Sequence, residues 1–298
     1  MLVDYNSAVA PSQPLTDVTR LMGAGPDGGD PLLDELGAVA LETAGAAAAI
    51  LASSVGRERE QVSTKSSSTD MVSEVDRAAE AIVSSILSRR RPHDGLLAEE
   101  GTSREGSSGV RWVVDPLDGT TNFLFGIPQF AVSVAAEIDG QPVVGVVVDP
   151  SRNETWAAAT DRPARCNGVP CHVAADRSTL PTALVSTGFG YAPARRAWQA
   201  DVASRVIPRV RDLRRFGAAA LDLCWVAAGR IDAHYEWGLN PWDLSAGRVI
   251  CQQAGGRVEI LEGRMIVATA PDLFDPLVAL LDEAGALRPP PGDEPAHW

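Results

Sequence analysis

The chain has 298 residues, of which 45% are hydrophobic and 22% are charged, a balance typical of a soluble globular protein with an ample core. Its formal net charge of −13 disfavours nucleic acid as the main partner, because surfaces that bind nucleic acid are basic. Residues 1–30 lack the basic start and the apolar core of a signal peptide. No membrane association is therefore expected, and this segment is predicted to be a disordered tail.

Hydrophobic periodicity predicts helices and strands between this tail and a second disordered tail over 288–298, where successive prolines prevent a helix. Helices are predicted over 32–55 and 71–90. Two strands are predicted within 132–148, around a turn. Beyond residue 171 strands and helices alternate, over 183–186, 195–206, 218–228, 231–235, from 241 onward and over 257–260. This order predicts an α+β half over 31–170 followed by an α/β half over 171–287.

Acidic residues follow two predicted strands at the point where each strand ends. The apolar run 110–114 leads into Asp115 and Pro116, and the run 96–98 leads into Glu99. Because Pro116 has no N–H to donate, we expect the first of these strands to end there. The two strands would then deliver their acids to the same edge of a sheet.

The helix predicted to begin at Pro241 carries a further acid, Asp243, in its first turn. Together the strand ends and this helix supply a set of four carboxylates, Glu99, Asp115, Asp118 and Asp243. Oxygen ligands of this kind suit hard divalent cations, which would let an anionic substrate approach the acids. A purely structural explanation stays open, since Asp118 with Gly119 is also a common turn and Asp243 suits a helix dipole without any metal.

These motifs resemble those of the inositol monophosphatase family of magnesium-dependent, lithium-sensitive phosphatases. The resemblance covers about residues 31–287 and rests on motifs in the family's order, namely KSSSTDMVSEVD (65–76), AEEG (98–101), DPLDGTTNF (115–123) and YEWGLNPWDLSAG (235–247). The third and fourth motifs together are highly specific. The resemblance implies a layered αβαβα sandwich with the active site at the junction of its halves, a homodimer and hydrolysis of a small phosphate ester.

The resemblance also implies how the acids are used. Two or three Mg²⁺ ions are expected, the first held by Glu99, Asp115 and the carbonyl of Leu117. The second would be held by Asp115, Asp118 and Asp243, and a weaker third would lie near Glu99. Attack by a metal-activated water would then be direct and in line, without a phosphoenzyme.

The remaining implied roles concern the water, the phosphate and the leaving group. Thr120 is expected to hold the attacking water with support from Asp76, and the N–H groups of Gly119 and Thr120 to bind phosphate. Glu236 would accept hydrogen bonds from inositol hydroxyls. Gly217 and Ala219 are expected to be further substrate contacts. Lys65 and Asp70 are expected to belong to a mobile active-site flap; a surface linker is the plainer explanation of that segment.

One departure from the family concerns the substrate and leaves the metal chemistry untouched. Ala218 stands where members with inositol activity usually carry a hydroxyl. Other esters of the same family are therefore open alternatives: histidinol phosphate, fructose 1,6-bisphosphate or a 3′-phosphoadenylate. A regulatory role linked to RNA or polymerase, implied by some bacterial members, is a less favoured one. The aspartyl-phosphate route of haloacid-dehalogenase-like phosphatases is disfavoured, because DPLDGT is one residue longer than their DxDGT motif.

Two further residue classes predict less specific features. The four cysteines form no CxxC motif, so we expect reduced thiols and a cytoplasmic protein. Cys166 and Cys171 lack the additional neighbours that a zinc site needs. The basic run from Arg205 to Arg215 is expected to be a solvated helix end and strand.

Overall fold

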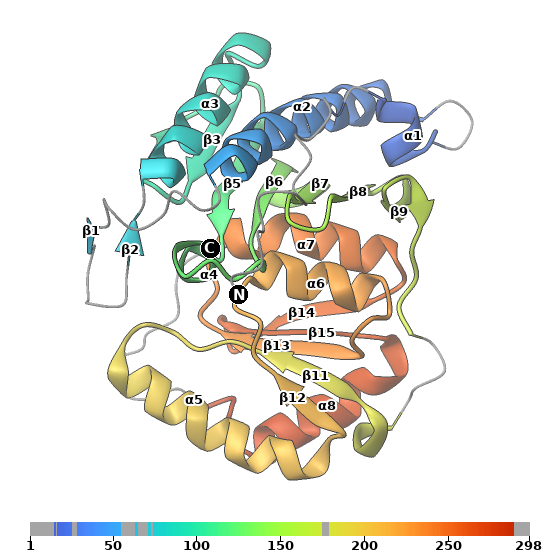
Figure 1. Ribbon diagram of the computed structural model, residues 1–298. Helices are drawn as coiled ribbons and strands as arrows, with labels where there is room; N and C mark the ends of the chain where they lie inside the picture. Colours follow the sequence, from blue (N-terminus) through green and yellow to red (C-terminus); the bar gives the residue numbers. More distant parts are fainter. Residues whose placement is uncertain are drawn as a thin grey trace, which may run out of the picture.

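Five layers are stacked on one another in the order helix, sheet, helix, sheet, helix, as Figure 1 shows from top to bottom. The structure is a computed structural model and describes residues 15, 17–25, 29–54, 63–64, 71–72, 74–174 and 179–288. Lys65, Asp70 and the predicted C-terminal tail beyond residue 288 lie outside the described residues. The layered αβαβα sandwich predicted from the sequence is confirmed.

The larger sheet is built from the N-terminal half of the chain. Within the described residues it has eight strands, in the spatial order β10 (Val169–Pro170), β9 (Arg162–Cys166), β8 (Glu154–Ala159), β7 (Gln141–Asp149), β6 (Ala131–Ile138), β5 (Val110–Asp118), β3 (Gly95–Ala98) and β4 (Ser103–Arg104). Neighbouring strands are antiparallel, apart from the parallel pair β3 and β5. Trp112 and Val114 of β5 face one hydrophobic core and Val113 faces another. Because both faces of the sheet are buried, its strands are almost continuously apolar.

The smaller sheet is built from the C-terminal half. It has five described strands, in the order β12 (Asp212–Arg214), β11 (Leu184–Thr187), β13 (Ala233–Trp237), β15 (Met265–Thr269) and β14 (Arg257–Leu261). β11 is parallel to both of its neighbours, whereas β15 is antiparallel to both of its own. A separate ribbon pairs β1 (Ser63–Thr64) with β2 (Met71–Val72).

Helices form the other three layers. The outer ones are α2 (Pro31–Ser54) with α3 (Glu74–Arg90) on the larger sheet, and α5 (Pro193–Val206) with α8 (Pro271–Glu283) on the smaller sheet. Between the sheets lie α6 (Ala219–Ala227) and α7 (Pro241–Gln253), which pack against one another and contact strands of both sheets. By length and composition α2 could cross a membrane, but 56% of its most apolar window is buried inside the protein, as in the core helix of a soluble fold.

The prediction for the N-terminal end is wrong in two places. Residues 17–22 of the predicted tail contain a short helix, α1 (Val18–Met22), whose Leu21 and Met22 are buried in the core beneath α2. Five residues are too few for periodicity to reveal a helix. The helix predicted from residue 71 begins at Glu74, because residues 71–72 pair with β1 instead.

Candidate active site

A cavity of about 190 Å³ lies where the two sheets and the central helices meet. Its walls include ten of the site residues predicted from the sequence, which are Glu99, Asp115, Leu117, Asp118, Gly119, Thr120, Gly217, Ala219, Glu236 and Asp243. Asp76 is 1% exposed in the first turn of α3, and its charge contributes to the raised pKa of Asp115 in this cavity. The fold therefore gathers residues from four separate stretches of sequence around one opening.

Pairing of β3 with β5 places the first two acids at the same edge of the larger sheet. The strands are parallel with Ala98 opposite Val114. The backbone N–H of Glu99 continues this pairing by donating to the carbonyl oxygen of Val114 at 3.2 Å. Glu99 and Asp115 each follow this last pair, so the prediction that two strands deliver acids to one edge is confirmed.

The predicted end of the strand at Pro116 is wrong, since β5 runs on to Asp118. The ladder with β6 shifts register between Asp115 and Asp118, and such a bulge accommodates a proline that cannot donate to the ladder. Gly119 follows with φ of +88°. A Cβ at Gly119 would lie 2.8 Å from the carbonyl oxygen of Gln129, so only glycine suits this turn.

Each of the three aspartates is held by a backbone N–H. Leu117 donates to Asp115 Oδ1 at 2.9 Å, and Ala220 of α6 donates to Asp118 Oδ2 at 2.8 Å. The N–H of Asn240 donates to Asp243 Oδ2 at 2.8 Å, so Asp243 also has the structural role at the start of α7 that its sequence position allows. A carboxylate has several acceptor sites, so an oxygen held in this way leaves the group able to bind a cation as well.

The acids repel one another in a buried environment. Burial, followed by the charges of Glu99 and Asp118, raises the pKa of Asp243 well above its usual range, and the same causes act on the pKa of Asp115. Burial raises the pKa of Asp118 to about 7, although backbone N–H donors and Arg215 oppose the shift. Like charges brought together out of water favour either protonation or a bound cation.

The donor set of this cluster suits a hard divalent cation, because it consists of carboxylates and a carbonyl without histidine or cysteine. As placed, no three acid, histidine or cysteine side chains of the described residues stand at the distances of one metal cage. The acids thus line a shared cavity and repel one another, but the described residues do not form a preassembled metal cage.

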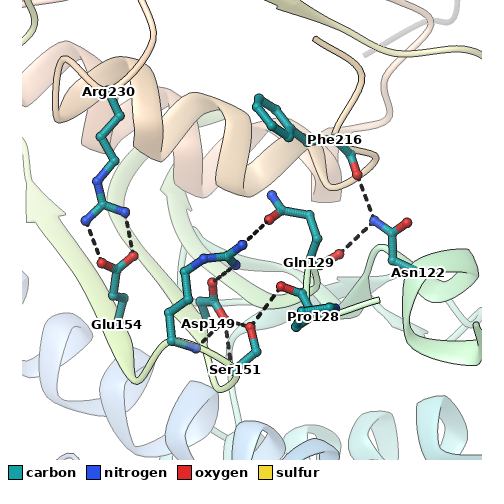
Figure 2. Close-up of polar contacts among 9 residues, drawn as sticks. Asn122, Pro128, Gln129, Asp149, Ser151, Glu154, Phe216 and Arg230 are labelled. Carbon is teal, nitrogen blue, oxygen red and sulfur yellow. Dashed lines mark hydrogen bonds and ion pairs between the residues drawn. The ribbon is translucent and has the colours of Figure 1, made fainter. Parts of the chain in front are cut away.

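The hydroxyl of Thr120 and the amide of Asn122 organise the turn after β5. Thr120 Oγ1 donates to the carbonyl oxygen of Leu117 at 3.0 Å. Asn122 Nδ2 donates to the carbonyl oxygens of Gln129 and Phe216, both at 2.8 Å, as Figure 2 shows. Asn122 thereby ties α4 (Thr120–Leu124) to the segment that leads into α6, so that two walls of the cavity are joined.

Sequence patterning missed several residues that line the cavity. They are Gly188, Phe189, Gly190, Tyr191, Arg195 and Arg215. Arg215 belongs to the basic run predicted to be solvated; it is exposed, as predicted, and it also lines the cavity. Its charge lowers the pKa of Glu236, which burial nevertheless raises to about 7. The only signal in the sequence was that Arg215 stands two residues before Gly217.

Comparison with known proteins agrees with this geometry. The family model described as "Inositol monophosphatase family" matches residues 32–285. An inositol-1-monophosphatase from Mycobacterium bovis is 42% identical over 252 residues, covering 77% of this chain and 84% of that protein. The Nus factor SuhB of Escherichia coli K12 is 40% identical over 198 residues, covering 66% of this chain and 74% of that protein.

The fold agreement is equally clear among solved structures. The extragenic suppressor protein suhB from Bartonella henselae superposes with a TM-score of 0.77 at 38% identity, covering 82% of this chain and 97% of that one. Fold and cavity define a phosphoric monoester hydrolase. The chain belongs to the inositol monophosphatase family, whose members are generally metal-dependent.

Proposed function

We propose that this chain is a Mg²⁺-dependent hydrolase of phosphate monoesters of neutral polyols, with inositol 1-phosphate as its substrate. The observation that carries the proposal is the presence of Glu236 in the same cavity as the four clustered acids. A carboxylate accepts hydrogen bonds from vicinal hydroxyls but repels an acidic leaving group. The relative from M. bovis bears the name inositol-1-monophosphatase, which supports the same substrate.

Two or three Mg²⁺ ions would be held by the carboxylates and carbonyl that line the cavity. In this assignment Asp115 contributes to two ions, one shared with Glu99 and the carbonyl of Leu117, the other with Asp118 and Asp243. When bound, Mg²⁺ neutralises charge on the transferring phosphoryl group and makes a coordinated water more acidic. The all-oxygen donor set and the raised pKa values of these acids support the assignment.

The chain's own groups would orient the reactants. The side chain of Thr120, fixed by its hydrogen bond to Leu117, would hold the attacking water, and Asp76 would support it from the first turn of α3. Backbone N–H groups of Gly119 and Thr120 would contact phosphate oxygens, which the absence of a side chain at Gly119 allows to come close. Glu236 would hold the leaving group in line with the water.

A panel of esters assayed with Mg²⁺ tests this proposal. It should compare kcat/KM for inositol 1-phosphate, histidinol phosphate, fructose 1,6-bisphosphate and p-nitrophenyl phosphate. Inositol 1-phosphate is expected to be preferred, and its hydrolysis should stop in EDTA and return with Mg²⁺. A preference for histidinol phosphate, whose leaving group is cationic, would move the assignment to the alternative suggested by Ala218.

A second candidate function rests on one observation, the name Nus factor SuhB of the relative from E. coli. A role linked to RNA or polymerase would accompany or replace catalysis. Binding of RNA or of RNA polymerase at physiological salt, with no turnover of any ester, would favour this second function over the first.

A further inference from the structure

Behind Glu236 a chain of buried polar side chains leads away from the cavity. Its members are His234, Ser186 and Asp222, which are 0%, 0% and 1% exposed. Ser186 and His234 are direct partners across the parallel strands β11 and β13. Asp222 reaches them from α6, which packs on β13. Three polar residues in such a place need hydrogen-bonding partners, because unpaired buried polar groups are costly.

The contacts within this chain are specific. Ser186 Oγ lies 2.8 Å from His234 Nδ1, and the Ser186 hydroxyl is also hydrogen-bonded to the carboxyl group of Asp222. On its other side the ring of His234 points at the cavity residue, with Nε2 at 3.7 Å from Glu236 Oε2. That separation is longer than a hydrogen bond, and Nε2 has no other hydrogen-bond partner among the described residues.

Glu236 is held close to the ring from the opposite side. A Cβ at Gly188 would lie 2.0 Å from Glu236 Oε2, so the carboxylate occupies the space that a side chain would fill. The charged cavity residues that interact electrostatically with Glu236 are Arg215, Asp118 and Asp243, while His234 and Asp222 lie behind it. The His234 ring therefore forms the buried back wall of the Glu236 position.

The protons shared by Asp222, Ser186, His234 and Glu236 can be arranged in two ways. In one, a protonated Asp222 donates to Ser186 Oγ, the Ser186 hydroxyl donates to His234 Nδ1, and the Nε2–H of His234 points at an ionised Glu236. In the other, Ser186 donates to an ionised Asp222, His234 Nδ1–H donates to Ser186, and the bare Nε2 faces a protonated Glu236. The imidazole is neutral in both, and a single proton is placed at one end or the other.

The surroundings favour the first arrangement. The Glu236 side chain is 15% exposed, whereas Asp222 is 1% exposed, so an ionised carboxylate costs less at Glu236 than at Asp222. Burial raises the pKa of Asp222 well above its usual range, but raises that of Glu236 only to about 7. Burial also lowers the pKa of His234 to about 3, which keeps the ring neutral.

We propose that His234 is a positioning residue for polyol recognition, whose Nε2–H, set by Ser186 and a protonated Asp222, keeps Glu236 ionised and aimed into the cavity. The proposal rests on the proposed function, because Glu236 is taken as the acceptor of the substrate's hydroxyls. It predicts that His234 influences esters of polyols and leaves esters without neighbouring hydroxyls unaffected.

Kinetics of three variants test the proposal. His234→Phe keeps a flat ring but removes Nε2–H, so KM for inositol 1-phosphate should rise about tenfold, as expected when a buried charged group loses the polar N–H that faces it. KM should become low only at a higher pH than in wild type, because Glu236 would ionise less readily without the N–H of His234. For p-nitrophenyl phosphate kcat/KM should stay within about twofold of wild type.

We call the hydrogen-bonded series Asp222, Ser186 and His234 the relay. Two companion variants distinguish an effect of the relay on Glu236 from a merely structural effect. Asp222→Asn keeps an N–H donor toward Ser186, so it mimics the protonated acid and should retain KM for inositol 1-phosphate within about threefold. Tyr235→Phe is the matched control, because Tyr235 is the neighbouring residue on β13 and packs in the core on the other face of the sheet. It should leave the ratio between the two esters unchanged. Equal losses for both esters in His234→Phe would overturn the proposal.

A spectroscopic measurement that does not depend on catalytic activity distinguishes the two proton arrangements. The chain has four histidines, so comparison with His234→Phe assigns the His234 signals in ¹H–¹⁵N spectra. The neutral Nε2–H tautomer is expected throughout pH 5–8. A neutral Nδ1–H tautomer, or protonation of the ring near its ordinary pKa, would refute the relay. If the wild-type chain hydrolyses no ester with Mg²⁺, the proposed function fails while this measurement still decides the relay.

Discussion

Replacement of Asp118 by asparagine should stabilise the metal-free protein while it impairs catalysis. The pKa of Asp118 is raised from 3.8 to about 7, chiefly by burial, and each pKa unit corresponds to about 1.4 kcal/mol. Keeping this group ionised at pH 8 without metal therefore costs about 4 kcal/mol of folding free energy. Asparagine carries no charge, and its carbonyl oxygen can still accept the N–H of Ala220 that Asp118 accepts at 2.8 Å.

The sign of the pH dependence follows from the direction of the shift. An acid whose pKa is raised on folding destabilises the folded state fully above the folded pKa, partly between the two pKa values, and not at all below 3.8. The gain from Asp118→Asn in EDTA should thus be largest at pH 8, roughly 10 °C in melting temperature. It should fall below about 2 kcal/mol at pH 5.

Thermal melting in EDTA and in Mg²⁺, together with turnover, measures these effects. Mg²⁺ should raise the melting temperature of wild type more than that of Asp118→Asn, and the variant should lose roughly 10²-fold or more in kcat. Asp94→Asn is the control, because Asp94 is also buried but is paired with Arg91 and Trp112. It should destabilise by about 3 kcal/mol in both conditions. Lower melting of Asp118→Asn in EDTA, or equal Mg²⁺ responses, would refute the repulsion argument.

Three further predictions follow from the site. Thr120→Ala should lower kcat by roughly 10² with little change in Mg²⁺ affinity, since a hydroxyl that positions water acts mainly in the transition state; a rise in KM at constant kcat would mean that Thr120 only binds phosphate. Asn122→Ala should destabilise by about 2–3 kcal/mol and lower kcat/KM, because it leaves the carbonyls of Gln129 and Phe216 without their donor; wild-type melting would show that the two walls are joined by other contacts. Millimolar Li⁺, but not Na⁺, should inhibit in a nearly uncompetitive manner, because Li⁺ has the size of Mg²⁺ with half its charge; Asp243→Asn should abolish this response, and equal effects of both ions on wild type would indicate screening alone.

The acid cluster was predictable from the sequence because local rules place it. Strands that are buried on both faces end where polar residues begin, and the carboxyl ends of the neighbouring strands β3 and β5 share one edge. Asp243 is likewise fixed by Pro241 and the first turn of α7. The two specific motifs, DPLDGTTNF and YEWGLNPWDLSAG, then indicated a family, and the family resemblance predicted how these elements are arranged in the fold.

The part of the cavity wall that contains Arg215 was not predictable from the sequence, because it depends on contacts between distant segments. Arg215 faces the acids only after β12 pairs with β11 and α6 docks against both sheets. The pairing of Ser186 with His234 follows from a strand register that neither segment encodes alone. A lone buried histidine carries no pattern in sequence, and its role emerges from its neighbours in space.

Among the elements that pattern analysis did not predict, two have local explanations. β15 follows β14 after a short turn and begins with four successive apolar residues, a run that periodicity does not distinguish from a buried helix. α8 contains Pro276, which argues against a helix interior. The proline is the sixth of the 13 residues of α8 and removes one internal hydrogen bond, and the buried leucines of the helix outweigh that loss.

The most direct test of the whole account is the Mg²⁺ dependence of kcat/KM for inositol 1-phosphate, measured on wild type and Asp115→Asn side by side. Asp115 is 1% exposed and is assigned to two ions, so its replacement should remove cation binding without opening a cavity. Wild type is expected to show saturable activation by Mg²⁺, and the folded variant to retain no measurable turnover at any Mg²⁺ concentration. Turnover that needs no divalent cation, or wild-type activity of the variant at saturating Mg²⁺, would contradict the account.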